Sequence, residues 1–328
     1  MFLPRFNVTV RTNAAELPAR DSFCINDCTP PSGSVMVKPV QRTLRGRSFV
    51  FAVTDSTAMA DNITPPSALM SELIAENCKK LCNTTTDKLG IIVNDFLTEA
   101  NGELSSKASA NSLRNYGASY AMLHILDGTA VISNLGNVSA FLLRGDELSQ
   151  LSENHSKKQE LVAAGGPSED ENETQLHVLK KYVGHSKCGD PVTPYFSETV
   201  EVERDDVFLL CSNGITDKLP ESRIKYILSL QTTDEKIVRR LISEALARGA
   251  EDDVTAMLIR NGGKPIRSKK KKSLFIVAAI AAALLAAAIA GISVRNNSPA
   301  NKPAISEEAG VVTPSASPAP TEFMTIEE

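Results

Sequence analysis

Three short motifs place acidic side chains at the ends of expected strands. They read VTDS at 53–56, LCSNGITD at 210–217 and RGAEDDVT at 248–255. Carboxylates fixed at strand ends can converge in space, and hard divalent cations prefer oxygen ligands. Taken singly, an Asp after a strand is more often a turn or capping residue. The motifs therefore predict a candidate metal site, with structural turns as the competing interpretation.

Short strands and paired helices must position these motifs. Apolar runs predict strands at 48–54, 118–126, 130–133, 138–144, 147–151, 207–211 and 254–260. Apolar residues at helical spacing predict helices at 65–81, 86–100, 155–164, 222–230 and 234–248. Because helices come in pairs and strands in runs, the pattern favours an α+β layered fold with antiparallel sheets over a doubly wound parallel fold.

The order of the motifs resembles that of the PPM-type (type 2C) metal-dependent serine/threonine protein phosphatases. In that family a strand leads into Asp-Gly, a later strand carries Gly-Asp-Ser-Arg, another ends in Ser-Asp-Gly, and the domain closes with Asp-Asn-Val-Thr. The corresponding segments here are 53–56, 135–144 (LGNVSAFLLR), 208–214 (FLLCSNG) and 247–255 (ARGAEDDVT). The resemblance covers most of residues 5–260 and implies a layered β-sandwich flanked by helix pairs.

The resemblance also implies roles for single residues. In the family, carboxylates bridge two divalent ions, which activate a water molecule for attack on a phosphoryl group. By position, Asp55 is the bridging ligand, Asp252 a second ligand, and Asp21 the Asp of the family's early Asn-Glu-Asp. Four positions are altered: Arg20 replaces the early Glu, Ser56 a Gly, Asn213 an Asp, and Asn137 the Asp that would hold a third ion.

Charge makes these changes important. The residues at the four family ligand positions, Arg20, Asp55, Asn213 and Asp252, carry a net charge of −1 instead of −4. Asn keeps an oxygen ligand without its charge, and magnesium gives up its water reluctantly. Compensation could come from two nearby carboxylates, Asp253 and Asp217. The sequence therefore predicts a degenerate metal centre with Mn²⁺ or Mg²⁺ bound weakly or not at all.

No residue is assigned to catalysis with certainty, and the phosphate-binding group stays unknown, with Arg5 and Arg11 as candidates only. We expect a phosphatase-like regulatory protein, non-catalytic or weakly active, that binds a phosphorylated protein or a regulatory partner in phospho-signalling. Two alternatives stay open. One is an active Mn²⁺- or Mg²⁺-dependent phosphatase that hydrolyses phosphoserine and phosphothreonine, and the other is a membrane-bound scaffold.

The C-terminal part of the chain differs from the rest. Residues 273–294 (SLFIVAAIAAALLAAAIAGISV) carry no charge and would extend ~33 Å as a helix, enough for a bilayer core of ~30 Å. The preceding linker, 261–272, holds six basic and no acidic residues. This bias predicts a single-pass membrane protein with residues 1–260 in the cytoplasm and the tail outside. The tail, 295–328, is rich in Pro, Ala, Ser and Glu and is expected to be disordered.

Composition excludes nucleic-acid binding from the expected functions. The 328 residues include no Trp and only 5% aromatic residues, so platforms for base stacking are scarce. The phosphatase-like domain, 1–260, holds 27 basic and 34 acidic residues, a net charge of −7. An acidic domain repels the phosphate backbone of a nucleic acid.

Four cysteines form two C-x-x-x-C pairs, Cys24 with Cys28 and Cys78 with Cys82. A four-thiolate zinc site would require the two pairs to meet in space. The spacing permits zinc but does not specify it. Reduced cytosolic thiols are the favoured interpretation.

Overall fold

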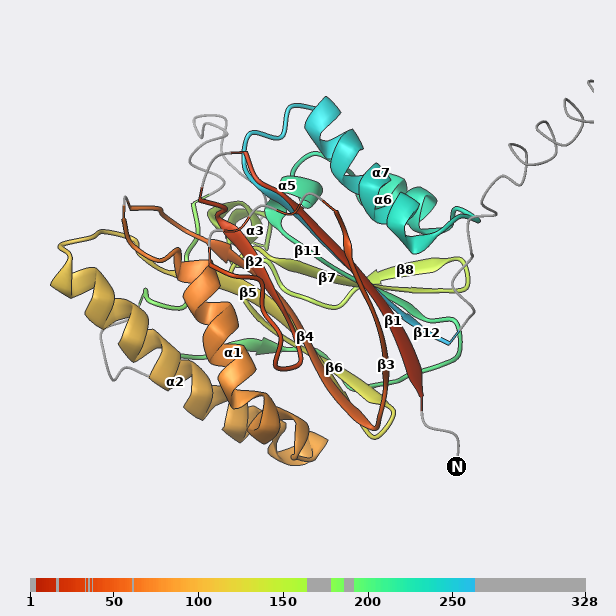
Figure 1. Ribbon diagram of the computed structural model, residues 1–328, viewed down its shortest axis with the longest axis horizontal. Helices are drawn as coiled ribbons and strands as arrows, with labels where there is room; N and C mark the ends of the chain where they lie inside the picture. Colours follow the sequence, from red (N-terminus) through yellow and green to blue (C-terminus); the bar gives the residue numbers. More distant parts are fainter. Residues whose placement is uncertain are drawn as a thin grey trace, which may run out of the picture. The chain divides into compact units, whose positions relative to one another are not determined.

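Two antiparallel β-sheets face each other at the centre of the described part of the chain (Figure 1). The computed structural model describes residues 4–15, 18–32, 34, 36, 38–60, 62–163, 178–185 and 192–262. The first sheet has the order β3-β1-β12-β11-β7-β8, formed by Val40–Arg45, Arg5–Asn13, Val254–Asn261, Val207–Cys211, Ser139–Arg144 and Glu147–Gln150. The second has the order β10-β6-β5-β4-β2, formed by Val200–Glu201, Thr129–Leu135, Ala118–Leu126, Ser48–Ser56 and Asp21–Ile25, with β9 (Tyr195–Phe196) paired to β6.

Apolar residues on the facing sides of the sheets form the central core. Phe6 and Val8 of β1 are buried in one cluster with Phe49 and Phe51 of β4. The rings of Phe6 and Phe49 meet edge to face, with centroids 5.3 Å apart. Burial of such large apolar side chains favours association of the two sheets, because each removes much apolar surface from water.

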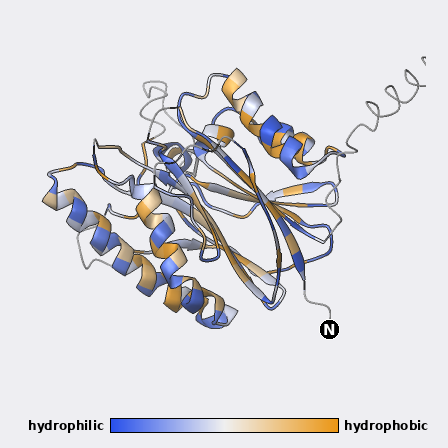
Figure 2. Cartoon of the chain, in the orientation of Figure 1, coloured by the Kyte–Doolittle hydropathy of each residue, from blue (hydrophilic) through white to orange (hydrophobic). Residues whose placement is uncertain are grey.

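Helices cover the outer face of each sheet. The pair α1 (Pro66–Cys82) and α2 (Thr86–Ala110) packs on the second sheet, and α5 (Asn213–Thr216), α6 (Glu221–Leu228) and α7 (Asp234–Ala247) pack on the first. A short helix, α3 (Lys157–Ala163), follows β8. In Figure 2, hydrophobic and hydrophilic colours alternate along both the helices and the front strands, and hydrophobic colour is present on strands between the helix layers. The predicted α+β sandwich flanked by helix pairs is thereby confirmed.

The second helix is longer than its sequence suggested. The sequence predicts a helix at 86–100, before the turn-forming Asn101-Gly102, yet α2 continues to Ala110. Tertiary contacts explain the continuation: Asn101 is buried and its Oδ1 accepts a hydrogen bond from the Gly184 N–H at 2.9 Å. One turn later, Leu104 is completely buried against the second sheet. Packing therefore overrides a local stop signal.

The predicted membrane span lies outside the described residues, as do the tail and most of the basic linker. Within the described ranges, no helix combines the length and apolar character that a bilayer crossing requires. The span at 273–294 stays a prediction.

Leu104→Ala tests the role of the extended part of α2. We expect the free energy of unfolding to fall by about 2–5 kcal/mol, because the substitution leaves a cavity under the helix. Urea unfolding followed by circular dichroism measures this change. The matched control is Ile91→Ala in the same helix, where the side chain is 65% exposed and the change should stay within about 0.5 kcal/mol. Equal losses in both variants would contradict the assigned packing.

Candidate functional site

The predicted site residues lie where strand ends from both sheets meet. Asp21 at the start of β2 pairs in register with Asp55 near the end of β4. In the first sheet, Asn213 follows β11 and Asp252 lies just before β12. The Ser56 N–H donates to the carbonyl of Arg20 at 3.0 Å, which fixes the strand ends against each other. Residues from distant parts of the chain thereby share one edge of the sandwich.

A cleft of about 460 Å³ opens at this edge. Its lining includes a set of residues singled out from the sequence, namely Arg20, Asp55, Ser56, Asn137, Asn213 and Asp252. Three of the six carry a formal charge: two carboxylates and one guanidinium. The cleft therefore holds a cation of the chain itself among the groups expected to bind metal.

Arg20 forms an ion pair inside the cleft. Its Nη1 lies 2.9 Å from Asp252 Oδ1, and its Nε is buried without a hydrogen-bond partner. The side chains of Arg20 and Asp252 are 35% and 56% exposed, so water screens part of their attraction. The ion pair nevertheless engages Asp252, one of the two acidic residues retained at the family's ligand positions.

The pKa values of the paired aspartates, Asp21 and Asp55, are both raised. Burial, and then the charge of Asp253, raises the pKa of Asp21 to about 7. Burial, and then the charge of Asp21, raises the pKa of Asp55 well above its usual range, while the nearby Arg20 opposes the rise. Both shifts have the sign that desolvation gives a carboxyl group. Two adjacent carboxylates at this depth therefore disfavour full ionisation.

The two carboxylates considered as compensating ligands have other partners. Asp253 is 2% exposed. Its Oδ1 accepts the Ala15 N–H at 2.7 Å, and its Oδ2 accepts the N–H groups of Arg20 at 2.7 Å and Asp21 at 3.2 Å. Asp217 Oδ2 accepts a hydrogen bond from Asn213 Nδ2 at 3.2 Å and lines an adjacent pocket of about 640 Å³. Neither carboxylate lines the cleft.

Asn137 stands between the cleft and the adjacent pocket and lines both. Its Oδ1 is buried without a hydrogen-bond partner.

The preceding Gly136 has φ +103°, and a Cβ there would lie 2.2 Å from the Ser119 Cβ. His155 Nδ1 lies 3.1 Å from the Gly136 N–H and accepts its hydrogen bond. Glycine is required at 136 because only it allows this close approach.

One wall of the cleft was not expected from the sequence. Tyr182 and His185 line it, with ring centroids 4.8 Å apart. Two backbone hydrogen bonds of 2.9 Å between Ala118 and Val183 hold this segment beside β5. A Cβ at Gly117 would lie 2.4 Å from the Val183 carbonyl oxygen. In the sequence, Gly117 could indicate that another backbone segment packs closely against β5. A glycine alone does not show which segment this is.

The residues of the cleft do not fit a two-ion metal centre. The positive charge of Arg20 would repel a divalent ion placed beside Asp252. Asn213 supplies no charge, and the oxygens of Asp253 accept backbone N–H groups. In the described part of the chain, no three His, Cys, Asp or Glu side chains are gathered as a metal-ligand group.

Comparison with known proteins adds independent information about relatives. A family model described as Stage II sporulation protein E (SpoIIE) matches residues 65–261, more than half of the chain. The serine/threonine phosphatase stp of Listeria innocua is 27% identical over 178 residues, covering 53% of this chain and 69% of the relative. Protein phosphatase PhpP of Streptococcus pneumoniae is 28% identical over 166 residues, covering 50% of this chain and 66%, about two thirds, of the relative.

Solved structures share the fold. The S. agalactiae serine/threonine phosphatase superposes with a TM-score of 0.62 at 18% identity, covering 77% of this chain and 98% of that one. The catalytic domain of the phosphatase PstP, solved with two manganese ions, gives a TM-score of 0.58 at 18% identity, covering 79% and 100%. Together with the family match, these likenesses show that the chain belongs to the SpoIIE family and has the fold of the PPM-type serine/threonine phosphatases.

Proposed function

We propose that this chain is a phosphatase-like regulatory protein whose cleft binds a phosphorylated protein partner and hydrolyses it weakly or not at all. The observation that carries the proposal is the ion pair between Arg20 and Asp252 within the cleft. A guanidinium in this position supplies the positive charge that a divalent ion would otherwise contribute. Under this proposal the cleft binds a phosphoryl group without the metal ions that hydrolysis requires.

The electrostatics of the cleft support the loss of hydrolysis. Among the described residues that line the cleft, only Asp55 and Asp252 are carboxylates, and Arg20 offsets one of them. Asn213 offers a neutral oxygen, and its amide nitrogen donates to Asp217. Because divalent-ion affinity depends on the number of charged ligands, this set favours weak binding of Mn²⁺ or Mg²⁺.

The same groups suit a phosphoryl group. Guanidinium groups bind phosphate oxygens through paired, charge-assisted hydrogen bonds. Asp252 is 56% exposed, so an incoming phosphate can exchange with it as the partner of Arg20. Asn115 and His185 also line the cleft and offer polar groups for further contacts.

A second candidate function is metal-dependent dephosphorylation of phosphoserine or phosphothreonine. It is favoured by the retention of Asp21, Asp55 and Asp252 around the cleft. It is also favoured by the names of the relatives, which are called serine/threonine phosphatase and protein phosphatase.

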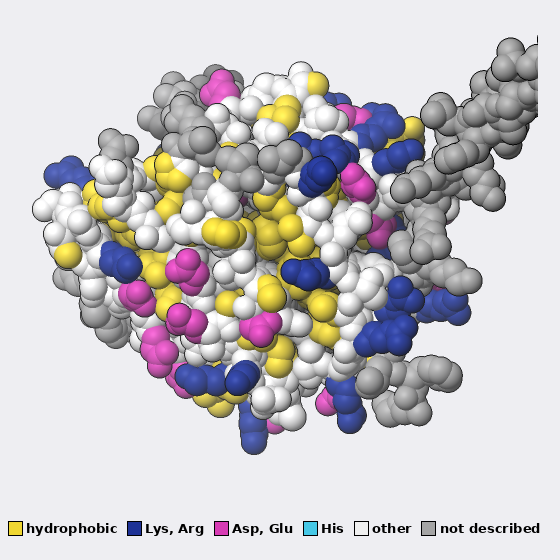
Figure 3. Space-filling view, viewed as in Figure 1, with side chains coloured by type: hydrophobic (Ala, Val, Ile, Leu, Met, Phe, Trp, Pro, Cys, Tyr) yellow, Lys and Arg dark blue, Asp and Glu magenta, His cyan; other side chains and the backbone are white. Residues whose placement is uncertain are grey.

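We further propose that the protein is anchored in a membrane by residues 273–294, with the phosphatase-like domain in the cytoplasm. The uncharged span and its basic flank support this. The described chain ends next to the start of β1, since Asn261 pairs with Phe6. Arg5 pairs in register with Arg45 at the same end, and Figure 3 shows Lys and Arg side chains gathered there, at the lower right. A basic end suits the anionic inner face of a membrane.

Restoration of ligand charge tests the proposed loss of metal. Arg20→Glu combined with Asn213→Asp should tighten Mn²⁺ binding by at least about tenfold, because two carboxylates replace a cation and an amide. Isothermal titration calorimetry of the full chain measures binding. Arg45→Glu with Asn94→Asp changes the net charge equally at exposed positions outside the cleft and should leave the weak wild-type binding unchanged.

Turnover distinguishes the two candidate functions. The wild-type chain should release little or no phosphate from a phosphoserine peptide in the presence of Mn²⁺. Rapid release that Asp55→Asn abolishes would establish the active phosphatase instead.

Phosphate recognition predicts a separate effect of Arg20. Fluorescence anisotropy with a degenerate pool of labelled phosphoserine peptides should show binding that Arg20→Ala weakens about tenfold or more. Arg45→Ala removes an equal charge outside the cleft and should leave the affinity unchanged. Equal binding by the Arg20→Ala variant and the wild type would contradict phosphate recognition by this cleft.

The proposed topology is tested by protease added to intact cells that express the chain. We expect the tail at 295–328 to be trimmed and residues 1–260 to stay whole, because the bilayer shields the cytoplasmic side. Immunoblotting against tags at each end gives the result. Digestion of residues 1–260 in intact cells would show the opposite orientation and contradict the proposed topology.

A further inference from the structure

The pocket of about 640 Å³ beside the cleft, here called the side pocket, is contiguous with it. It lies between β7, β8, the start of α3 and the segment that joins α5 to α6. Asn137 lines both hollows. Asn213 of the cleft also donates from its Nδ2 to Asp217 Oδ2 of the side pocket at 3.2 Å. A peptide bound in the cleft can therefore continue into the side pocket.

Asn137 stands at the junction with an unused acceptor. Its Oδ1 is buried and has no hydrogen-bond partner. Such an acceptor costs free energy until it is paired. A backbone N–H of a peptide that passes from the cleft to the side pocket would pair with it after a rotation of the amide group.

The side pocket combines apolar surface with polar groups. Phe141 and Ile224 are almost completely buried behind its lining. Tyr195 and Pro220 retain exposed surface beside them. The volume lies within the range of about 300–1,000 Å³ that is usual for ligand pockets. Apolar surface of this kind suits the methylene groups of a long side chain.

Three exposed carboxylates give the side pocket a negative charge. Glu153, Asp217 and Glu221 line it, and Lys158 is the one cation among its described lining residues. In the described part of the chain, these carboxylates are not gathered as a metal-ligand group. A larger organic cation, which contacts separated carboxylates through several N–H groups, suits this arrangement better than a metal ion.

The backbone at Glu153 is fixed by β6. The side chain of Asn134, which is completely buried, accepts the Glu153 N–H at 3.0 Å and donates to the Glu153 carbonyl at 2.6 Å. His155 Nε2 lies 3.9 Å from Glu153 Oε1. Burial lowers the pKa of His155, so at neutral pH the imidazole does not neutralise this carboxylate. Glu153 therefore offers its charge from a defined position.

We propose that the side pocket binds a Lys or Arg side chain of the phosphorylated partner. This inference rests on the proposed function, because the phosphoryl group in the cleft positions the peptide. The methylene groups of the basic side chain lie on Tyr195 and Pro220, and its cationic end lies against the carboxylates. Because an extended chain rises about 3.3 Å per residue, the basic residue lies within about three positions of the phosphorylated one.

The opposite charges of the two hollows determine which peptides bind. Arg20 in the cleft attracts the phosphoryl group, and the side pocket attracts a cation. A phosphopeptide with an acidic residue at the same position would place like charges together. Charge complementarity of this kind selects partners by rejecting the wrong ones as well as by binding the right one.

Fluorescence anisotropy with three sets of labelled phosphoserine peptides tests the side pocket. The sets differ only in whether Lys, Ala or Glu stands at the positions within about three residues of the phosphoserine. The full wild-type chain should bind the Lys set about fivefold more tightly than the Ala set, and the Glu set most weakly. Glu153→Gln combined with Glu221→Gln should narrow the difference between Lys and Ala to about twofold or less.

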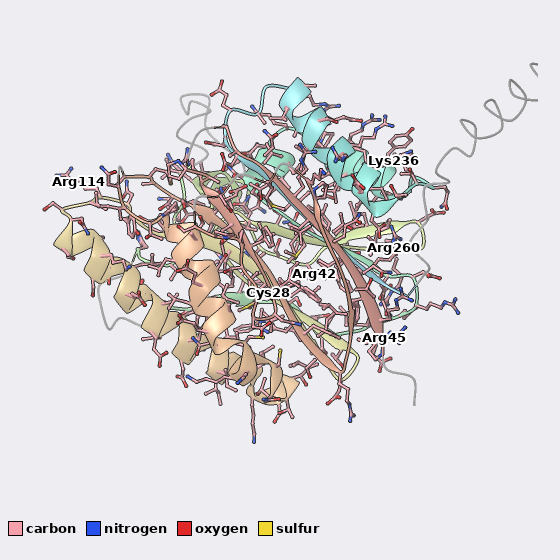
Figure 4. All side chains as sticks on the ribbon, viewed as in Figure 1. Cys28, Arg42, Arg45, Arg114, Lys236 and Arg260 are labelled. Atoms are coloured by element: carbon pink, nitrogen blue, oxygen red, sulfur yellow. The ribbon has the colours of Figure 1, made fainter. Side chains whose placement is uncertain are left out.

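A matched control removes the same charge elsewhere. Glu76→Gln combined with Glu99→Gln changes two exposed residues of α1 and α2. Figure 4 shows these helices on the opposite side of the sheets from α6 and α7, where Lys236 is labelled. The control variant should keep the wild-type preference for Lys. Equal narrowing in both double variants would show a general charge effect and overturn the inference.

Charge reversal gives a second readout that loss of structure would not mimic. Glu153→Lys combined with Glu221→Lys should favour the Glu peptides over the Lys peptides. If this variant fails to fold, as judged by circular dichroism, the Gln pair still tests the side pocket.

The outcomes separate this inference from the proposed function. Wild-type binding that depends on Arg20 but is the same for Lys, Ala and Glu peptides would overturn the side pocket and leave the proposed function intact. Absence of binding to every phosphopeptide would overturn both.

Discussion

The buried carboxylate of Asp253 is the interaction on which the cleft depends. It accepts backbone N–H groups from Ala15, Arg20 and Asp21, and so holds the segment between β1 and β2 against the start of β12. A buried carboxylate is stable only when such donors surround it, and these donors would be orphaned without it. The backbone of Arg20 is fixed by this contact, so the position of its side chain in the cleft follows from it.

In the proposed function, the placement of Arg20 sets the chemistry of the cleft within a shared fold. Solved relatives with this architecture include one bound to two manganese ions. In this chain, a guanidinium pairs with Asp252 in the cleft instead. A permanent charge on the chain needs no desolvation of an ion from water, whereas magnesium binds only after losing part of its hydration shell. Under the proposed function, the positive charge of the cleft therefore comes from the chain itself.

Helix α1 begins beside the cleft and ties its edge to the second sheet. Its first two turns contribute Ser67 and Ser71, which contact Ser56 and Thr54 of β4, respectively, through buried hydroxyl groups. Helix α1 packs on the second sheet, so these contacts join the edge of the cleft to the core of that sheet.

Strong local patterns were enough to predict several elements and the order of the motifs from the residues alone. The apolar run of β4 and the periodic α7 were predicted because their own residues specify them, whereas the mostly polar edge strand β3 was missed because pairing with β1 defines it. The sequence also located Asp55, Asn213 and Asp252 at strand ends. Their partners follow from the folded arrangement: Arg20 and Asp252 are separated by 232 positions, and the carboxylate of Asp253 binds backbone N–H groups and does not line the cleft. The ion-pair and hydrogen-bond partners of these side chains depend on distances across the fold. Local sequence patterns do not encode those distances.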